Sequence, residues 1–324
     1  FKEGVFEWAE RIGGFAMEQM KVGQRGCPKC STVCGNIVID SEDKESELDY
    51  ENVAMLGSNL GIGDLREVSS LNRRADELGL DTISLGSVLA FSMEARERGL
   101  LEGPEWGDHK AARELIDMIA FREDMGDMLA EGVKAVSERI GGQEFAMHVK
   151  GLEVSAYDCR IAPAMALAYG TSPIGAHHKD AWVIGWELSS EATLEEKVEK
   201  VIEHQRLRGG FFESAVVCRF PWLELGVQLD LYRKAFHFVT NVTLDMNALG
   251  DRIYSAIRKF WIRELGGWGL EMDMPPKRWF LHPFTKGPYA GSKLDAGLYA
   301  KMLELYYKTV SYTHLRAHET RHDL

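Results

Sequence analysis

Apolar side chains recur at intervals of three and four residues along most of this chain. In the segment "LREVSSLNRRADELGL", residues 65–80, the apolar positions are Leu65, Val68, Leu71, Ala75 and Leu78. This spacing places them on one face of a helix, and the glycine that follows is a common helix stop. The same spacing predicts helices in residues 110–124, 126–142, 193–210, 229–239, 250–265 and 292–307.

Signals for β-strands are few, and the clearest is "GNIVID", residues 35–40. The helical pattern gives way to irregular sequence near "HVKGLEVSAYDCR", residues 148–160. We therefore predict a mainly α-helical protein, with one helical domain in residues 1–148 and a second in residues 149–310.

Composition and charge exclude several classes of protein. The chain has 324 residues, 45% of them hydrophobic, which is enough for one large domain or two domains with real cores. Its net charge of −12 argues against binding to nucleic acid, whose backbone attracts basic proteins. The sequence contains no signal peptide and no apolar run long enough to span a membrane. Clustered cysteines in so long a chain do not resemble a secreted disulfide framework, so we expect a cytoplasmic location.

Both ends suggest a fragment of a longer protein. The chain opens at Phe1 without a methionine, and its last residues, 311–324, read "SYTHLRAHETRHDL". This string resembles translated sequencing-adapter readthrough. We expect it to be a non-native tail and leave it out of the site.

Three cysteines lie within eight residues in "RGCPKCSTVCGN": Cys27, Cys30 and Cys34, in the pattern C-x2-C-x3-C. Three thiolates from one loop and a fourth from elsewhere often hold an iron–sulfur cluster. Structural zinc and buried structural thiols are the weaker alternatives, because zinc sites usually have two paired knuckles. Spacing alone leaves Cys159 and Cys218 open as the fourth ligand.

Further motifs follow the cysteine loop in a fixed order. They are "DYENVAMLGSN" (49–59, compare E-Y-E-T-x-x-x-L-G-S-N), "DELGLD" (76–81, compare D-x-x-G-L-D), "VKGLEVSAYDCR" (149–160, compare V-K-G-L-E…Y-D-P-R), "ALAYGTSPIGAHH" (166–178, compare Y-A-T-S-x-R-G-A-x-H) and "ESAVVC" (213–218, compare D-x-x-G-L-C). Together with the cysteine loop, they resemble the aldehyde:ferredoxin oxidoreductase family, which are tungsten enzymes with a bis-pterin cofactor.

This resemblance implies a fold, cofactors and metal ligands. The fold would be that of the family's multi-helical C-terminal domains 2 and 3, and the β-rich N-terminal domain that cradles the pterins is missing from the sequence. Cys218 would join Cys27, Cys30 and Cys34 as the fourth ligand of a 4Fe-4S cluster. The second cofactor would be a bis-pterin that carries tungsten or molybdenum.

The resemblance also implies which residues contact the pterins. In the first motif these are Asp76, Gly79, Asp81 and Thr82. A carboxylate accepts two N–H groups of a pterin edge at once, and glycine lets the backbone come close. In the second motif Glu213 replaces the family's aspartate, and Val216 and Val217 replace Gly-Leu.

Two catalytic residues are implied in the same way. Glu51 stands where the family has a carboxylate beside the metal, and it would act as a general base. His178 stands on the family histidine, and it would hold the substrate carbonyl oxygen or pass a proton. His177 beside it is an unusual addition. Cys159 replaces the proline of Y-D-P-R, and it is either a small buried hydrophobe or a thiolate ligand.

The implied function is oxidation of an aldehyde to a carboxylic acid, with electrons passing through the cluster to ferredoxin or to an iron–sulfur electron-transfer subunit. A homodimer is compatible with this interpretation. Within the same superfamily, the alternative is the tungsten subunit of a class II benzoyl-CoA reductase. The alternative of another class is a non-catalytic iron–sulfur or zinc-binding module.

Overall fold

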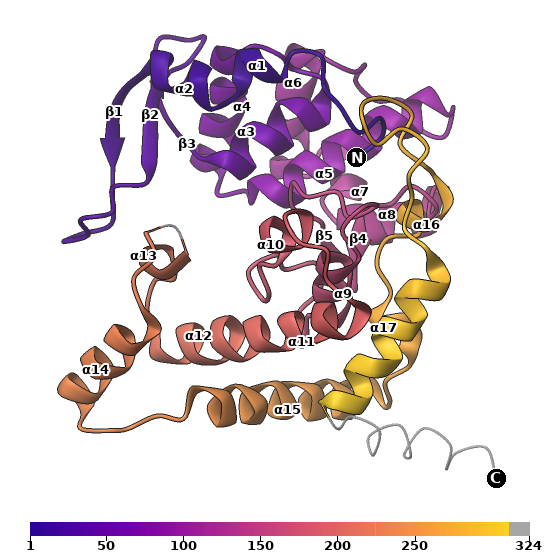
Figure 1. The fold of residues 1–324 in the computed structure, drawn as a ribbon. Helices are drawn as coiled ribbons and strands as arrows, with labels where there is room; N and C mark the ends of the chain where they lie inside the picture. The colour runs from indigo at the N-terminus through magenta and orange to yellow at the C-terminus, as the bar shows by residue number, and fades with distance from the viewer. Residues whose placement is uncertain (224, 311–324) are drawn as a thin grey trace. The chain divides into compact units, whose positions relative to one another are not determined.

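The computed structural model describes residues 1–223 and 225–310, and these form two compact units (Figure 1). Unit 1 comprises Phe1–Ile161 and Pro276–Lys293, and unit 2 comprises Ala162–Pro275 with the C-terminal segment from Leu294. The sequence-based boundary after residue 148 stays a prediction. So does the non-native tail at 311–324, which lies outside the described residues.

Most described residues are helical, which confirms the predicted mainly α-helical fold. None of the described helices is long and apolar enough to span a membrane.

Unit 1 combines a small sheet with a bundle of helices. Its elements are α1 (Ala9–Ile12), α2 (Gly14–Met20), β1 (Lys21–Arg25), β2 (Gly35–Ile39), β3 (Glu45–Leu48), α3 (Tyr50–Leu56), the 3-10 helix η1 (Ser58–Leu60), α4 (Leu65–Leu78), α5 (Thr82–Glu97), α6 (His109–Phe121), α7 (Met125–Leu129), α8 (Gly132–Ile140), β4 (His148–Val149), β5 (Leu152–Glu153) and α16 (Lys277–Leu281). The strands β1, β2 and β3 form an antiparallel sheet in that order. The main core lies among α4, α5, α6 and α8, where apolar side chains such as Leu71, Leu89 and Ile116 are buried.

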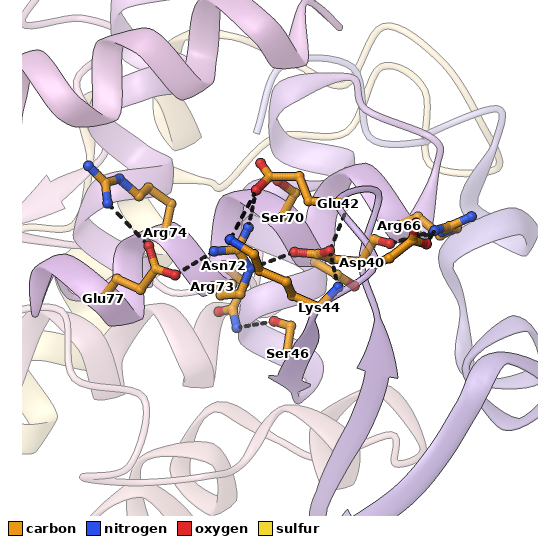
Figure 2. A network of polar contacts seen from close by, with 12 residues as sticks. Asp40, Glu42, Lys44, Ser46, Arg66, Ser70, Asn72, Arg73, Arg74 and Glu77 are labelled. Atoms are coloured by element: carbon orange, nitrogen blue, oxygen red, sulfur yellow. Dashed lines mark hydrogen bonds and ion pairs between the residues drawn. The ribbon is translucent and has the colours of Figure 1, made fainter.

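A polar network ties the sheet of unit 1 to α4 (Figure 2). Arg73 on α4 donates to Asp40 at the end of β2 over 2.6 Å and to Glu42 in the β2–β3 turn over 2.6 Å. It also pairs with Glu77 one helical turn further along α4. Because Asp40 is fully buried, this pairing satisfies a charge that would otherwise be very unfavourable inside the protein. The network fixes the last turns of α4, which lead into the first predicted pterin motif.

Unit 2 is built around long helices. Its elements are α9 (Pro163–Thr171), α10 (Ile184–Leu188), α11 (Leu194–Gln205), the π-helix η2 (Arg206–Phe212), α12 (Glu213–Ala215), α13 (Phe220–Leu223), α14 (Leu229–Thr240), α15 (Met246–Leu265), the 3-10 helix η3 (Leu270–Asp273) and α17 (Ala296–Thr309). Figure 1 shows α11 and α12 as one continuous rod, joined by η2, with α15 running beside it. Apolar side chains of η2, among them Phe211 and Phe212, pack with Met246 of α15 in a buried cluster.

The helices predicted from apolar spacing are present, with instructive differences. Gly79 ends α4 in the left-handed region, at φ 69°. The segment 126–142 is broken into α7 and α8, because Gly132 takes a positive φ of 85° that interrupts the helix. The segment 193–210 is α-helical only to Gln205 and continues as a π-helix. The spacing rule missed α5 and α9, whose residues are buried on most sides and so show no single apolar face.

Candidate functional site

The three clustered cysteines lie in the loop between β1 and β2 of unit 1. Arg25 and Gly35 pair at the base of this loop. Within it, the amide of Cys30 donates to the carbonyl of Cys27 over 3.0 Å and closes a tight turn. Glycine suits position 35, because an added Cβ would lie 3.0 Å from the carbonyl oxygen of Arg25 and would displace the side chain of Glu47. All three cysteines are exposed, so a metal cluster could reach them.

The first predicted pterin motif forms the end of α4 and the start of α5. The amide of Gly79 donates to the carbonyl of Asp76 over 3.1 Å, and the amide of Leu80 donates to that of Ala75 over 2.8 Å. This pair of bonds is the Schellman arrangement that closes many helices. Asp81 then begins α5, where its carboxylate accepts from the amide of Ser84 over 2.7 Å. The side chains of Asp76 and Asp81 are exposed.

The second motif of unit 2 repeats this backbone arrangement with different side chains. The amide of Val216 donates to the carbonyl of Glu213 over 3.3 Å, and the amide of Val217 donates to that of Phe212 over 3.1 Å. Val216 takes the left-handed conformation at φ 52°, where the family motif has glycine. Glu213 and Cys218 are exposed, and Tyr232 donates to the carbonyl of Cys218 over 3.1 Å.

Glu51 has a specific partner in unit 1. It lies in the first turn of α3, and its Oε1 accepts a hydrogen bond of 2.9 Å from the hydroxyl of Tyr157. The ring of Tyr157 stacks on that of Tyr50 with centroids 5.3 Å apart. Burial, together with the Glu51 carboxylate, raises the pKa of Tyr157, so the phenol stays protonated and remains a donor. Sequence reasoning gave Tyr157 no role, although the tyrosine of the Y-D-C-R segment was the available signal.

A second contact joins α3 to the first pterin motif. Asn52 forms a reciprocal capping box with Asp49 at the start of α3, and its side-chain amide donates to the Thr82 hydroxyl over 2.9 Å. Glu51 therefore sits next to a residue that contacts Thr82. The structure brings the predicted base and the first motif into one region of unit 1.

His178 lies in a loop of unit 2 between α9 and α10 and is buried. Burial and the positive charges of Lys179 and Arg219 lower the pKa of His178 to about 2. The imidazole is therefore neutral at physiological pH and suited to hydrogen bonding rather than to carrying a charge. The neighbouring His177 lies 3.6 Å from Asp180, measured from Nδ1 to Oδ1, and is only half-buried.

Cys159 is fully buried, and its thiol lies 3.6 Å from the carbonyl of Tyr157. Asp158 and Arg160 on either side form an ion pair of 3.0 Å. Burial is compatible with both predicted roles of Cys159, a small hydrophobe and a thiolate ligand.

The predicted site residues are divided between the two units. Cys27, Cys30 and Cys34 belong to unit 1, and Cys218 belongs to unit 2. Within the described ranges, no group of three or more His, Cys, Asp or Glu side chains is arranged to hold a metal ion. The chemistry of the donors fits a thiolate-bound cluster and a pterin edge, and the four-cysteine ligand set stays a prediction.

Comparison with known proteins gives a consistent picture. The sequence model of aldehyde ferredoxin oxidoreductase, domains 2 and 3, matches residues 1–322. A tungsten-containing aldehyde ferredoxin oxidoreductase of Thermococcus kodakarensis is 33% identical, with 97% of this chain and 54% of the relative covered. The aliphatic sulfonate oxidoreductase WOR-like subunit of Pyrococcus furiosus is 29% identical, with 82% and 43% covered. The chain thus spans about half the length of the curated relatives it matches.

A solved structure shares the fold. It is described as the active-site complex BamBC of benzoyl-coenzyme A reductase with 1,5-dienoyl-CoA, and it superposes with a TM-score of 0.73 at 18% identity. The match covers 95% of this chain and 53% of the other.

Proposed function

The chain belongs to the aldehyde ferredoxin oxidoreductase family, and on that premise we propose that it serves the oxidation of an aldehyde to a carboxylic acid at a tungsten–pterin centre. Electrons would leave through a 4Fe-4S cluster to ferredoxin or to an iron–sulfur subunit. The observation that carries the proposal is the hydrogen bond from Tyr157 to Glu51, because it orients a carboxylate at the position of the family's general base.

The cofactors would be held by the residues of the two motifs and the cysteine loop. Cys27, Cys30, Cys34 and Cys218 would bind the cluster through their thiolates. Asp76, Asp81 and Glu213 would accept N–H groups of the pterins, with Thr82 nearby and Gly79 giving close access. When bound, the tungsten–pterin supplies a Lewis acid and the two-electron redox chemistry.

The remaining steps fall to side chains of this chain. Aldehyde oxidation takes an oxygen from water and releases two electrons and two protons. Glu51 takes a proton from the attacking water, while the protonated Tyr157 keeps one carboxylate oxygen in place. Neutral His178 donates a hydrogen bond to the substrate carbonyl oxygen, which draws electron density away from the carbon under attack.

The direct test is Glu51→Gln in the holoprotein. Glutamine keeps an oxygen that can accept from Tyr157 but cannot take a proton. We expect turnover to be abolished while the tungsten and iron contents stay normal. Glu45→Gln, an exposed glutamate on β3, is the matched control and should keep full activity. Undiminished activity in Glu51→Gln would contradict the assignment of the base.

A second candidate function is reduction of an aromatic acyl-CoA. It is favoured by the residues that depart from the family motif: the doubled histidine at His177, Ile174 in place of arginine, and Cys159. Assays with aldehydes and with benzoyl-CoA separate the two reactions. Metal analysis tests the remaining alternative, because a zinc module would contain zinc in place of iron, acid-labile sulfide and tungsten.

A further inference from the structure

One arginine of unit 2 is buried without a hydrogen-bond partner among the residues that the structure describes. Arg208 lies in the π-helix η2 and is 1% exposed. Its Nε, Nη1 and Nη2 atoms are all buried, and among the described residues none of them has a hydrogen-bond acceptor. Arg73 of unit 1 is nearly as buried but pairs with three carboxylates. Arg73 thus has carboxylate partners within the chain, whereas Arg208 has no such hydrogen-bond partner among the described residues.

The backbone around Arg208 is held by close packing. An added Cβ at Gly209 would lie 2.0 Å from the hydroxyl of Tyr254 on α15, and one at Gly210 would lie 2.4 Å from the Cα of Gly250. The two glycines therefore allow η2 and α15 to touch. Insertions that widen a helix into a π-turn occur often at functional sites. This contact holds the backbone that carries Arg208.

An unpaired buried cation is very unfavourable in a folded protein. Burial and the charge of Arg219 lower the pKa of Arg208 to about 9. Arg208 therefore remains a cation at neutral pH. The charges of Asp180 and Glu213 act on it, but neither carboxylate accepts a hydrogen bond from its guanidinium, whose N–H groups have no acceptor among the described residues. A small anion that enters from outside the polypeptide would supply the missing acceptors.

The charges around Arg208 show where that anion would bind. The positive charges of Arg208 and Arg219 both lower the pKa of His178, so these cations act on the predicted substrate-binding imidazole. The charge of Asp180, two residues after His178, acts on Arg208 in turn, and in the described part of the chain the buried Oδ2 of Asp180 has no hydrogen-bond partner. The negative charge of Asp180 disfavours a dianion such as phosphate more than a monoanion.

We propose that Arg208 binds a carboxylate group next to His178. This inference rests on the proposed function, which either forms a carboxylate from the aldehyde or uses an aldehyde that carries one. A guanidinium binds a carboxylate through two parallel N–H···O bonds, which match the unsatisfied donors of Arg208.

Calorimetric titration of acetate and benzoate into the holoprotein tests the site without turnover. We expect Arg208→Gln to weaken carboxylate binding by about tenfold to a hundredfold, and Arg208→Lys to weaken it less because the charge remains. The matched control is Arg206→Gln in the same π-helix, since Arg206 is half-buried and already pairs with Asp251 over 2.7 Å. This variant should bind carboxylates as the wild type does.

Three results would overturn the proposal. The first is that the wild type does not bind carboxylates. The second is that the wild type and Arg208→Gln bind carboxylates with equal affinity. The third is that Arg208→Gln loses both its tungsten and its affinity for carboxylates. The last result would mean that Arg208 holds the cofactor instead. Thermal unfolding of each variant identifies any that fails to fold, and Arg208→Lys then provides the comparison.

Steady-state kinetics then identify the source of the carboxylate. If the substrate carries it, Arg208→Gln should raise KM for succinic semialdehyde and leave KM for butyraldehyde unchanged. If it is the product, both KM values should stay the same while inhibition by the product acid weakens. If neither aldehyde is oxidised while carboxylate binding still depends on Arg208, the proposed function fails and the anion site stands.

Discussion

The turns at Gly79 and at Val216 have the same backbone but different surroundings. Each closes a helix through the same two hydrogen bonds and a left-handed residue. In unit 1 the left-handed residue is glycine, and the helix before it contains Arg73 with a full set of carboxylate partners. In unit 2 the left-handed residue is valine, and the helix before it contains the unpartnered Arg208.

The comparison suggests that the first turn is optimised for stability and the second is not. A β-branched residue in the left-handed region is strained. A buried cation without hydrogen-bond partners adds a further unfavourable contribution to the free energy of folding. Such departures cluster at functional sites, where the surrounding structure maintains them. We therefore expect substitutions in the first turn to destabilise the protein and one substitution in the second turn to stabilise it.

The largest expected effect comes from breaking the network before the first turn. Arg73→Met leaves Asp40 buried and without its cation, which should cost about 3–5 kcal/mol of unfolding free energy. Urea denaturation followed by circular dichroism measures the loss. Arg74→Met on the same helix is the control and should cost much less, because Arg74 and its partners Glu77 and Asp117 are partly exposed. Equal losses in the two variants would show that the buried pairing does not stabilise unit 1.

Lowering the pH should remove part of the stability that the pairing of Asp40 with Arg73 provides. Burial alone would raise the pKa of Asp40, but hydrogen bonds from Arg73 and from the amides of Lys44 and Glu42 outweigh it and hold the pKa below 3.8. A carboxylate whose pKa is lower in the folded than in the unfolded protein stabilises the fold at a pH above its unfolded-state pKa. This stabilisation is lost as the pH falls through its folded-state pKa. The stability difference between wild type and Asp40→Asn should therefore shrink below pH 3.8. A difference that is constant across this range would contradict the pairing.

Gly79→Val should give the next largest effect by placing a valine in the first turn, as in the second. An added Cβ at Gly79 would meet no atom within 4 Å, so the change tests only the backbone conformation. We expect a loss of about 2 kcal/mol in unfolding free energy. Gly79→Asn is the control, because asparagine tolerates the left-handed region, and it should lose less. If both variants unfold like the wild type, the left-handed turn carries no strain.

The sequence predicted the elements that have one apolar face. The helix at 65–78 and its glycine stop follow from spacing alone, since they bury one stripe of side chains. The helix at 82–97 could not be predicted in this way, because it is buried on most sides and its apolar residues do not recur on a single face. The π-helical continuation of α11 also lacks a local signal, and it packs through Gly210 on Gly250, forty residues later in the sequence.

The same limit applies to the candidate site. The motifs identified Glu51 and His178 by resemblance, but the bond from Tyr157 joins residues 106 positions apart in the sequence. Arg208 lies in "RLRGG", where nothing in the sequence distinguishes it from the half-buried Arg206 two residues earlier. Only the fold shows that one is buried and the other is paired.

The smallest expected effect is a gain in stability from Val216→Gly. Glycine relieves the left-handed strain, while its greater freedom in the unfolded chain offsets part of the gain. Val216 is 90% exposed and gives up little buried surface, so the net gain should be about 1 kcal/mol in urea denaturation. The control is Val217→Gly, which changes the next residue, one without a positive φ, and should destabilise. Equal destabilisation by both changes would mean that the valine is accommodated without strain, and the difference between the two turns would then lie in their charges alone.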